Sequence, residues 1–438
     1  MPDLSAPPLS AHAWAVATTL ATPGLRLLLR RRLARGKEVA ERLAERRGHD
    51  MTPRPVGRLV WLHAASVGET VSILPVLQAL HRAAPALSVL LTTGTVTSAA
   101  LAARRLGELE LDASVRHRFV PLDVPRWAAR FLDHWRPDAA GFVESELWPN
   151  LLRACRARAI PTMMINARMS SKSLAGWRRA PRLAAWLLSG FAAVRAQSAE
   201  DAARFASLGA RNVSAPGDLK FAAPALPADP AALAEGQALL AHRPLWLAAS
   251  THPGEEAEIF AAQRALMADH PDLLCILVPR HPERGPAIVA QAIAAGLACT
   301  SRAEGTAPPQ QGGVWVADTL GELGLWYRLS PIVFVGRSLI APGGGQNPLE
   351  PARLGCAVAV GPLTGNFAAA TQALTEVGAL ARVTDAAALA DWVERMLADP
   401  GTRAAMGEAG QRAADRYAHL PDETAAALLA LMPLEIIT

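Results

Sequence analysis

Three consecutive glycines, Gly343–Gly345, stand between a short apolar run and a stretch suited to starting a helix. The apolar run, Pro331–Gly336, predicts a buried parallel strand. After the glycines, Asn347 suits the N-cap, Pro348 the first helical position and Glu350 the third. Because glycine has no Cβ, its main-chain N–H groups can approach an anion closely. We therefore predict an anion site at a helix N-terminus, with Glu350 placed to bind ribose hydroxyls. The alternative is an ordinary strand-to-helix turn.

Carboxylates follow two further apolar runs. Glu69 lies near the start of a predicted helix, directly after the predicted strand 58–65, and Glu144 and Glu146 follow the predicted strand 139–143. In open α/β sheets, ligands bind at the carboxyl ends of the strands. A carboxylate at that edge can act as a general base toward a hydroxyl group. The alternative for Glu69 is a carboxylate that only complements the helix dipole.

Other polar residues have the same placement. Lys220, which is one of only three lysines in an arginine-rich chain, follows the predicted strand 213–216. Arg280 follows the predicted strand 273–278, and its planar fork suits phosphate binding. Residues 318–322 follow another strand and could present main-chain groups to the base of a nucleotide. Each of these could be a plain turn, but their shared position at strand ends favours a binding site.

The elements that must position these residues form two alternating sets, which predict an α/β fold with parallel sheets of Rossmann type. The strands are expected at 58–65, 87–92, 118–121, 139–143, 161–166, 192–197, 213–216, 244–250, 273–278, 297–300, 314–317, 331–335, 357–360 and 379–383. A linker rich in proline and alanine, residues 224–230, separates the sets. We predict an N-terminal segment over 1–35, a first domain over 36–228, and a second domain with terminal helices over 229–438.

Composition narrows the class of protein. A chain of 438 residues is too long for one ordinary hydrophobic core, so two domains are expected. Four scattered cysteines indicate neither a zinc site nor a disulfide framework. Residues 1–58 contain eleven Arg and Lys against five Asp and Glu, so the excess positive charge lies at this end. We expect no nucleic-acid partner, because no such motif is evident. The apolar stretch Leu9–Leu29, followed by Arg30–Arg32, predicts an interfacial helix or a tilted membrane anchor with cytoplasmic arginines, and the alternative is a helix packed on the domain. Residues 35–47 predict a charged surface helix.

Four motifs, in order along the chain, resemble the 3-deoxy-D-manno-octulosonic acid (Kdo) transferase family of GT-B glycosyltransferases. They are His63-Ala-Ala-Ser-Val-Gly-Glu69, Glu144-Ser-Glu-Leu-Trp-Pro-Asn150, Pro279-Arg-His-Pro282 and Gln346-Asn-Pro-Leu-Glu-Pro351. The resemblance runs from about Gly36 to about Met432. It implies two Rossmann-like domains facing across a cleft.

The resemblance also implies a reaction. Kdo would pass from CMP-Kdo to a lipid A precursor (lipid IVA) with inversion, in lipopolysaccharide core biosynthesis at the cytoplasmic face of the inner membrane. Neither a metal nor another cofactor is expected. Glu69 would be the general base, while Glu144, preferred over Glu146, and Lys220 would stabilise the transition state. The CMP-binding positions implied are Pro279, Arg280, Leu320, Gly321, Glu322, Asn347, Pro348, Leu349 and Glu350.

Two positions depart from the family pattern, since this chain has Gln346 and Leu363 where many members have histidine. These departures leave Glu69, Arg280 and Glu350 unchanged. Two other functions stay open at this point. A nucleotide-sugar 2-epimerase of the same architecture would need no lipid acceptor, and a non-catalytic nucleotide-binding protein would need no base.

Overall fold

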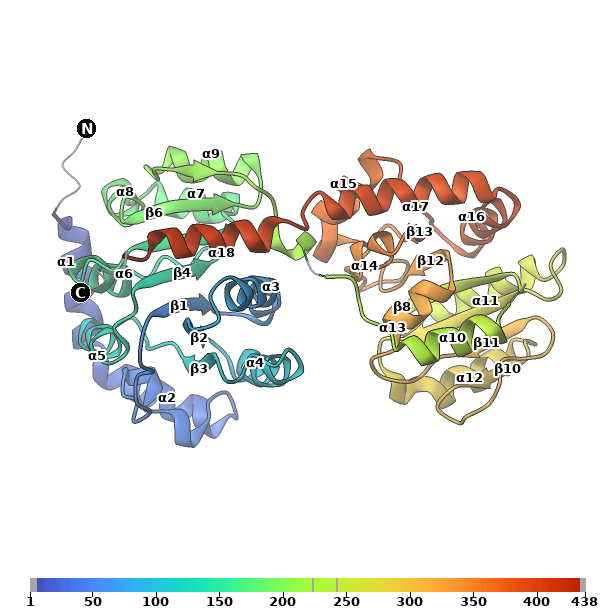
Figure 1. Ribbon diagram of the computed structural model, residues 1–438, viewed down its shortest axis with the longest axis horizontal. Coiled ribbons are helices and arrows are strands. Elements are labelled where there is room, and N and C mark those ends of the chain that lie inside the picture. Colours follow the sequence, from blue (N-terminus) through green and yellow to red (C-terminus); the bar gives the residue numbers. More distant parts are fainter. Residues whose placement is uncertain (1–5, 223, 242, 434–438) are drawn as a thin grey trace. The chain divides into compact units, whose positions relative to one another are not determined.

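The computed structural model describes residues 6–222, 224–241 and 243–433, which divide into two compact units. The first comprises Met1–Ala223 and Tyr417–Thr438, and the second Pro224–Arg416. Each unit is described by itself. The second predicted domain, 229–438, thus differs from the second unit at its C-terminal end. Helix α18 (Leu420–Leu431) belongs to the first unit, where it packs along α3 (Val67–Ala83) (Figure 1).

The first unit is built on a seven-stranded parallel sheet of order β3-β2-β1-β4-β5-β6-β7. Its strands are β1 Leu59–Ala64, β2 Ser88–Thr93, β3 Val115–Phe119, β4 Ala139–Val143, β5 Thr162–Ala167, β6 Phe191–Ala196 and β7 Val213–Ser214. All seven predicted strands are present. The largest difference is in β3, which begins three residues before its predicted start, since its charged residues hide the apolar pattern.

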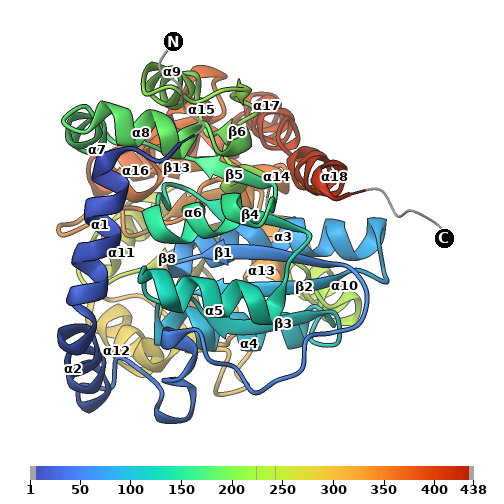
Figure 2. The same ribbon diagram turned by 90° about the vertical axis from the view of Figure 1, so that its left-hand side faces the viewer.

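Helices cover both faces of this sheet. On one face, α5 (Pro125–Trp135), α6 (Pro149–Ala157) and α8 (Pro181–Leu188) enclose one apolar core, and α1 (Leu9–Leu20) lies outside α5 and α6 (Figure 2). On the other face, α3, α4 (Val96–Glu108) and α18 enclose a second core. The remaining helices are α2 Thr22–Ala34, α7 Ser171–Trp177 and α9 Ala199–Ser207, with short 3₁₀ turns η1 Ala40–Arg42, η2 Glu45–Arg47 and η3 Leu219–Ala222.

The predicted charged surface helix over residues 35–47 is wrong. Residues 40–47 instead form the two 3₁₀ turns η1 and η2, and Arg46 is 2% exposed. Its guanidinium donates to the carbonyls of Gly94 (2.6 Å) and Val120 (3.2 Å) and to the buried carboxylate of Glu38 (2.9 Å). This segment therefore follows the needs of a buried arginine, whose hydrogen bonds must be satisfied, rather than helix propensity.

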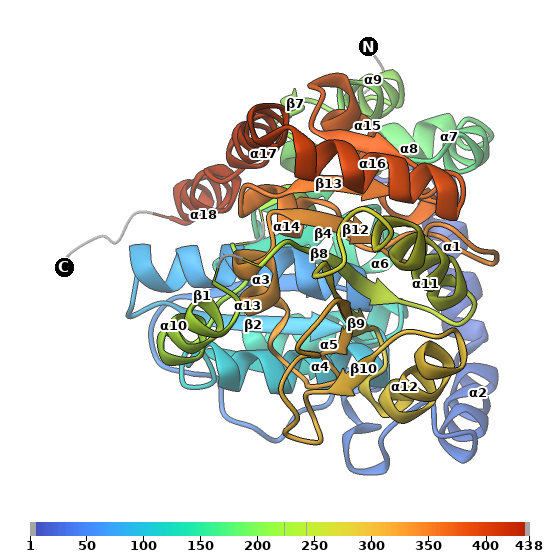
Figure 3. The same cartoon turned by 90° about the vertical axis from the view of Figure 1, so that its right-hand side faces the viewer.

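The second unit has its own seven-stranded parallel sheet, of order β10-β11-β9-β8-β12-β13-β14. The strands are β8 Leu245–Thr251, β9 Leu274–Pro279, β10 Cys299–Ser301, β11 Gly313–Val316, β12 Ile332–Val335, β13 Ala357–Val360 and β14 Leu380–Arg382, and they confirm the other seven predictions. Figure 3 faces this unit. The helices are α10 Pro230–Leu239, α11 Glu255–Leu266, α12 Gly285–Ala294, α13 Leu323–Leu329, α14 Leu349–Arg353, α15 Ala368–Glu376, α16 Ala386–Ala398 and α17 Pro400–Asp415.

Each sheet has a point where the chain reverses the direction in which it adds strands. In the first sheet this switch point lies between β1 and β4, and in the second between β8 and β12. At a switch point the loops after the two strands diverge, which opens a crevice for ligands at the carboxyl edge. Glu69 and Glu144 follow β1 and β4, and the triple glycine follows β12. The topology therefore brings the predicted residues to the two positions where α/β sheets bind ligands.

Candidate active site

Glu69 lies at the third position of α3, and Ser66 is the N-cap residue of this helix. The Ser66 hydroxyl and the Ala65 main-chain N–H each donate to the Glu69 carboxylate at 2.7 Å, and the side chain of Ser66 accepts from the Glu69 N–H. The residue is 6% exposed. Burial raises the pKa of Glu69 and outweighs these two hydrogen bonds, which lower it. The charges of Glu146 and Glu144 raise the pKa further. Glu69 thus lies in the first turn of the helix, as the alternative of a carboxylate complementing the helix dipole requires. Its raised pKa also makes the carboxylate more basic than usual.

Glu144 forms an ion pair with Lys220, whose Nζ lies 2.8 Å from Glu144 Oε1. Lys220 belongs to η3, and Asn166 at the end of β5 fixes that turn. The Asn166 amide donates to Asp218 at 2.9 Å and accepts from the Leu219 N–H at 2.8 Å. The structure therefore brings together two predicted residues that are far apart in sequence. Since both side chains remain partly exposed, a substrate can reach this pair.

Glu146 has different partners from Glu144. The Nε2 of the fully buried His63 lies 3.7 Å from Glu146 Oε2, and the Trp148 indole donates to the same oxygen. The other ring nitrogen of His63 lies 3.0 Å from the hydroxyl of Thr92. Burial raises the pKa of Glu146, but His63 and Trp148 outweigh it, and the net shift is downward. Glu146 is thus held as an anion beside Glu69. Sequence reasoning quoted His63 within a motif but assigned it no role.

In the second unit, the triple glycine is used differently from the prediction. The N–H of Gly344 donates to the carbonyl of Leu363 (3.1 Å), and that of Gly345 donates to the carbonyl of Arg337 (2.7 Å). The prediction that these N–H groups are free for an anion is therefore wrong for these two glycines. The glycines are still required, because all three have positive φ. A Cβ on Gly344 would also lie 2.6 Å from the side chain of Asn366.

The predicted helix start is displaced by one residue. Helix α14 begins at Leu349, so Pro348 occupies the N-cap position instead of the first helical one. Asn347 still caps, since its side chain accepts from the Leu349 N–H at 3.1 Å and its amide lies 3.3 Å from a Glu350 oxygen. With only five residues, α14 has a small dipole, and a strong anion site at its end is not expected.

Glu255, the first residue of α11, organises the loop after β12. Its carboxylate accepts from the N–H groups of Arg337 (2.6 Å), Ser338 (2.8 Å) and Leu339 (3.0 Å), and also from that of His252 (3.0 Å). The residue is 1% exposed. Sequence reasoning noted Glu255 among the polar residues after a strand but assigned it no role, because three of its four partners lie more than 80 positions away. The sole local signal was a pair of glutamates at a helix start.

Positive groups gather at the ends of β8 and β9. Arg280 is exposed, and its N–H donates to the carbonyl of Thr251 at 3.1 Å. In the described part of the chain, no carboxylate lies within ion-pair distance of its guanidinium. The rings of His252 and His281 lie 6.0 Å apart. Burial lowers the pKa of His252 and outweighs the hydrogen bond to the Ser250 carbonyl and the charge of Glu255, which raise it. This edge can thus accept a phosphate without displacing an ion pair.

The remaining predicted positions lie at the ends of β9 and β11. Pro279 ends β9, Leu320 is 84% exposed, and Gly321 has a φ of 85°. The Glu322 carboxylate is held in a two-point ion pair with Arg302, both contacts at 2.7 Å, which lowers the pKa of Glu322. Its side chain is therefore committed to the protein, and only main-chain groups of 320–322 are left to meet a ligand.

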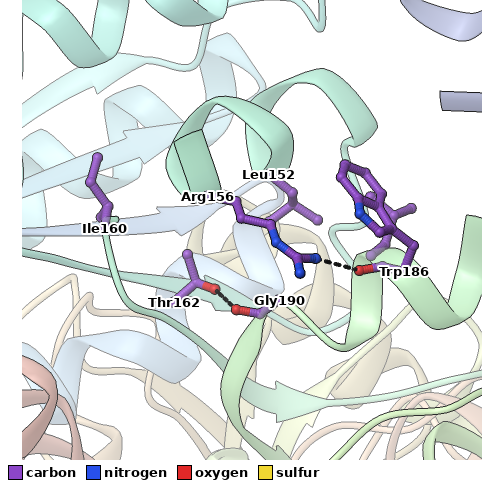
Figure 4. A pocket seen from close by; sticks show the side chains of 7 residues that line it. Leu152, Arg156, Ile160, Thr162, Trp186 and Gly190 are labelled. Atoms are coloured by element: carbon purple, nitrogen blue, oxygen red, sulfur yellow. Dashed lines mark hydrogen bonds between the residues drawn. The ribbon is translucent and has the colours of Figure 1, made fainter. Parts of the chain in front are cut away.

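A small cavity in the first unit lies away from these residues. Leu152, Arg156, Ile160, Thr162, Trp186, Leu187 and Gly190 line it (Figure 4). These residues belong to α6 and α8, precede β5 and β6, or, in the case of Thr162, begin β5, so the cavity is at the amino edge of the sheet. Its volume of about 20 Å³ admits one water molecule. This cavity cannot hold a nucleotide or a sugar.

The sequence of this chain is similar to those of known 3-deoxy-D-manno-octulosonic acid transferases. The family model described as 3-Deoxy-D-manno-octulosonic-acid transferase (kdotransferase) matches residues 37–223. The 3-deoxy-D-manno-octulosonic acid transferase of Bordetella pertussis is 39% identical over 367 residues, covering 82% of this chain and 84% of that protein. The probable mitochondrial 3-deoxy-D-manno-octulosonic acid transferase of Arabidopsis thaliana is 34% identical over 389 residues, covering 86% of each chain.

Solved structures add the fold. The UDP-GlcNAc 2-epimerase of Neisseria meningitidis matches with a TM-score of 0.56 at 12% identity, covering 86% of this chain and 99% of that one. A glycosyltransferase from Rickettsia africae matches with a TM-score of 0.53 at 11% identity and the same coverage. These likenesses confirm the predicted GT-B-like architecture of two α/β units, and at such identities they show the fold alone.

Proposed function

The chain belongs to the 3-deoxy-D-manno-octulosonic acid transferase family, whose members are glycosyltransferases, and from that premise we propose that it transfers Kdo from CMP-Kdo to a lipid A precursor (lipid IVA) in lipopolysaccharide core biosynthesis. The transfer inverts the configuration of the sugar and uses no metal. The observation that carries this proposal is the meeting of Glu69, Glu144 and Lys220 at the switch point of the first sheet.

Glu69 is the general base in this proposal. Its carboxylate takes the proton of the acceptor hydroxyl as that oxygen attacks the anomeric carbon of Kdo. The raised pKa supports this role, since a stronger base removes the hydroxyl proton more readily. The hydrogen bonds from Ala65 and Ser66 fix the position of the carboxylate, which limits the loss of orientation during attack.

Lys220 and Glu144 stabilise the charges that develop during transfer. The Lys220 ammonium supplies a positive charge near the carboxylate of Kdo or the departing phosphate, and Glu144 holds the ammonium in place. Glu146 is less suited to this role, because His63 and Trp148 already occupy its carboxylate. This difference in partners supports Glu144 as the stabilising residue.

The second unit binds the CMP portion of the donor. Arg280 offers a positive group to the phosphate and the neighbouring histidine rings can donate hydrogen bonds to it, and this support does not depend on the glycine N–H groups. The Asn347–Glu350 turn offers a carboxylate to the ribose, and main-chain groups of residues 320–322 offer hydrogen bonds to the cytosine base of CMP. A single leaving phosphate can be stabilised by such groups without a divalent cation.

Helices α1 and α2 bind the membrane surface in this proposal, at the cytoplasmic face of the inner membrane. No helix in the described residues is long and apolar enough to cross a membrane. The two helices instead expose large apolar side chains: Leu9 (88%), Trp14 (46%), Val16 (59%), Leu20 (76%), Leu27 (49%) and Leu28 (47%). Exposed arginines 30, 31 and 35 accompany them, which suits an anionic surface.

Contacts of α1 support a link between this surface and the acceptor. The indole of Trp14 donates to Asp123 (2.8 Å), just before α5, and the amide of Asn150 in α6 donates to Thr18 (3.0 Å). Helix α1 therefore crosses the N-terminal ends of α5 and α6, which lie at the carboxyl edge of the sheet (Figure 2). Glu69 and Glu144 lie at that same edge. A lipid held at the membrane surface thus lies on the side of the unit that contains the base.

One assay tests the proposal. The purified chain is incubated with CMP-Kdo and lipid IVA, and the products are analysed by mass spectrometry. We expect a lipid heavier by one or more Kdo residues, and release of CMP that depends on the acceptor. An epimerase or a non-catalytic nucleotide-binding protein would give no modified lipid, and that outcome would reject the proposal.

A further inference from the structure

An arginine cluster on the first unit has no part in the site described above. It consists of Arg26 on α2, Arg47 at the end of η2, and Arg126 and Arg130 on α5. Positions 126 and 130 are four residues apart on one helix, so their side chains share a face. The Arg130 guanidinium donates to the Arg47 carbonyl at 3.0 Å, and this links η2 to α5.

The turn that places Arg47 packs tightly on α5. A Cβ on Gly48 would lie 2.2 Å from the carbonyl oxygen of Trp127, so only glycine fits there. Gly48 also has a φ of 69°, which favours glycine independently. The approach of Arg47 to Arg126 and Arg130 is thus built into the backbone and does not depend on flexible side chains alone.

The cluster lacks the negative partners that neighbouring arginines have. Arg32 and Arg46 pair with Glu38, and Arg42 pairs with Glu45. For the four arginines of the cluster, by contrast, no carboxylate of the described chain lies within ion-pair distance.

Mutual repulsion within the cluster acts on the pKa of Arg130. Partial burial lowers the pKa of Arg130, and the charges of Arg126, Arg47 and Arg26 lower it further. His49 lies beside the cluster, and after desolvation its pKa is lowered by Arg130, Arg47 and Arg126. Like charges held together without counter-charges disfavour the fold, and an anionic ligand would relieve that cost.

The position of the cluster favours an anion as well. Arg126 lies in the first turn of α5, which contains no acidic residue and has the positive end of the helix dipole. The adjacent Arg46 donates to the carbonyls of Gly94 and Val120, which directly follow β2 and β3. The cluster is therefore near the carboxyl edge of the sheet, the edge crossed by α1 and occupied by Glu69.

We propose that the arginine cluster is a binding site for an anionic phosphate ester of a lipid, either the phosphate of the acceptor itself or that of a neighbouring membrane lipid. Planar guanidinium groups bind phosphate oxygens in pairs, and several of them together match the charge of a phosphomonoester. The assignment to a lipid rests on the proposed function, whereas binding of the phosphate group does not.

The first experiment uses inorganic phosphate as the probe. Melting temperatures of the full chain are compared in phosphate and in chloride at equal ionic strength, for the native protein and for Arg126→Gln/Arg130→Gln. We expect phosphate to raise the melting temperature of the native protein clearly more than that of the double variant, in which only the site at Arg280 is left to bind phosphate. Arg211→Gln is the matched control. Arg211 is exposed and precedes β7, which is the outermost strand on the side of the sheet opposite to β3. If the double variant does not fold, the exposed Arg126→Gln alone serves.

The second experiment distinguishes the two sources of phosphate. KM is measured for the phosphorylated acceptor and for the same lipid after enzymatic dephosphorylation, and binding is measured to phosphatidylglycerol and to phosphatidylcholine vesicles. If the acceptor is the source, the double variant raises KM about tenfold for the phosphorylated lipid only, the scale of one charged contact. If the membrane is the source, both acceptors are affected equally and binding to phosphatidylglycerol vesicles falls.

The two proposals fail in different ways. If the native protein modifies no lipid, the proposed function is rejected, and the melting experiment still tests the phosphate site. If the native protein transfers Kdo while the double variant retains the phosphate response, both KM values and vesicle binding, the arginine cluster binds no phosphate and this inference is overturned.

Discussion

Glu69 and Glu255 occupy equivalent places in the two units, yet their surroundings differ. Each is a buried glutamate in the helix that follows the first strand of its sheet, beside the switch point. Glu69 takes its hydrogen bonds from Ala65 and Ser66, within its own turn. Glu255 takes four main-chain N–H bonds, and three of them come from the loop after β12.

This difference separates the chemical role that we propose for Glu69 from a structural role of Glu255. Four donors occupy the lone pairs of the Glu255 carboxylate, so it has little capacity left to accept a proton from a substrate. Glu69 has fewer donors, and burial, together with the charges of Glu146 and Glu144, raises its pKa. Position in the fold therefore does not decide the role of a carboxylate. The number and origin of its hydrogen-bond donors do.

The largest expected effect is on catalysis through Glu69. We expect Glu69→Gln to lower kcat by about a thousandfold, because the proposed general base is lost while the shape of the turn is kept. CMP binding should be unchanged, as measured by calorimetry. Asp399→Ala, which removes the cap of α17 in the second unit, is the control for loss of a helix cap. If Glu69→Gln turns over as fast as the native protein, Glu69 is not the base.

Loss of the ammonium should have the next largest effect. We expect Lys220→Met to lower kcat about a hundredfold, since one positive group near the developing charge is removed. Lys172→Met, at an exposed lysine of α7, is the matched substitution and should leave kcat unchanged. Equal rates for the two variants would show that the Lys220–Glu144 pair has only a structural role.

Glu255→Gln should act on stability rather than on the chemical step. The amide group would face N–H donors it cannot satisfy, and we expect a loss of about 2 kcal/mol in the free energy of unfolding. Urea denaturation measures this value. Glu258→Gln in the same helix, where the carboxylate accepts one N–H from Ala386, should cost less. A catalytic role for Glu255 would instead appear as a large fall in kcat with stability unchanged.

A smaller effect is expected for the donor phosphate. Arg280→Ala should weaken CMP binding about tenfold, the scale of one charged hydrogen bond. Arg382→Ala, at an exposed arginine in β14, is the control. If titration calorimetry gives the same affinity for both variants, Arg280 does not contact the phosphate.

The smallest expected effect concerns pH. Because the pKa of Glu69 is raised, kcat/KM should fall as the pH drops through a value above the usual range of a glutamate. Removing the nearby charge by Glu146→Gln should move this acid limb to lower pH. Stability has the opposite sign, since a raised folded-state pKa favours the protonated form, and Glu69 destabilises the fold as pH rises through that pKa. Glu69→Gln should remove this component from the dependence of unfolding on pH.

Much of the fold could be predicted from sequence because its signals are local. Each buried strand of a parallel sheet is a short apolar run, and all fourteen runs correspond to observed strands. The placement of Glu69, Glu144 and Lys220 at strand ends was also readable, because polar residues directly follow those runs. Local signals failed where a long-range contact prevailed, as for Arg46, whose hydrogen bonds to Gly94 and Val120 replace the predicted helix.

The sequence by itself determined the alternation of strands and helices, the order of the motifs and, through them, the family. These properties depend on residue type and on spacing within a few turns of the chain. The tertiary structure alone decided that Glu255 is bound by the loop after β12, that Lys220 pairs with Glu144, and that the N–H groups of Gly344 and Gly345 are already used. Such partners are separated along the chain and meet only through strand order, so no local periodicity encodes them.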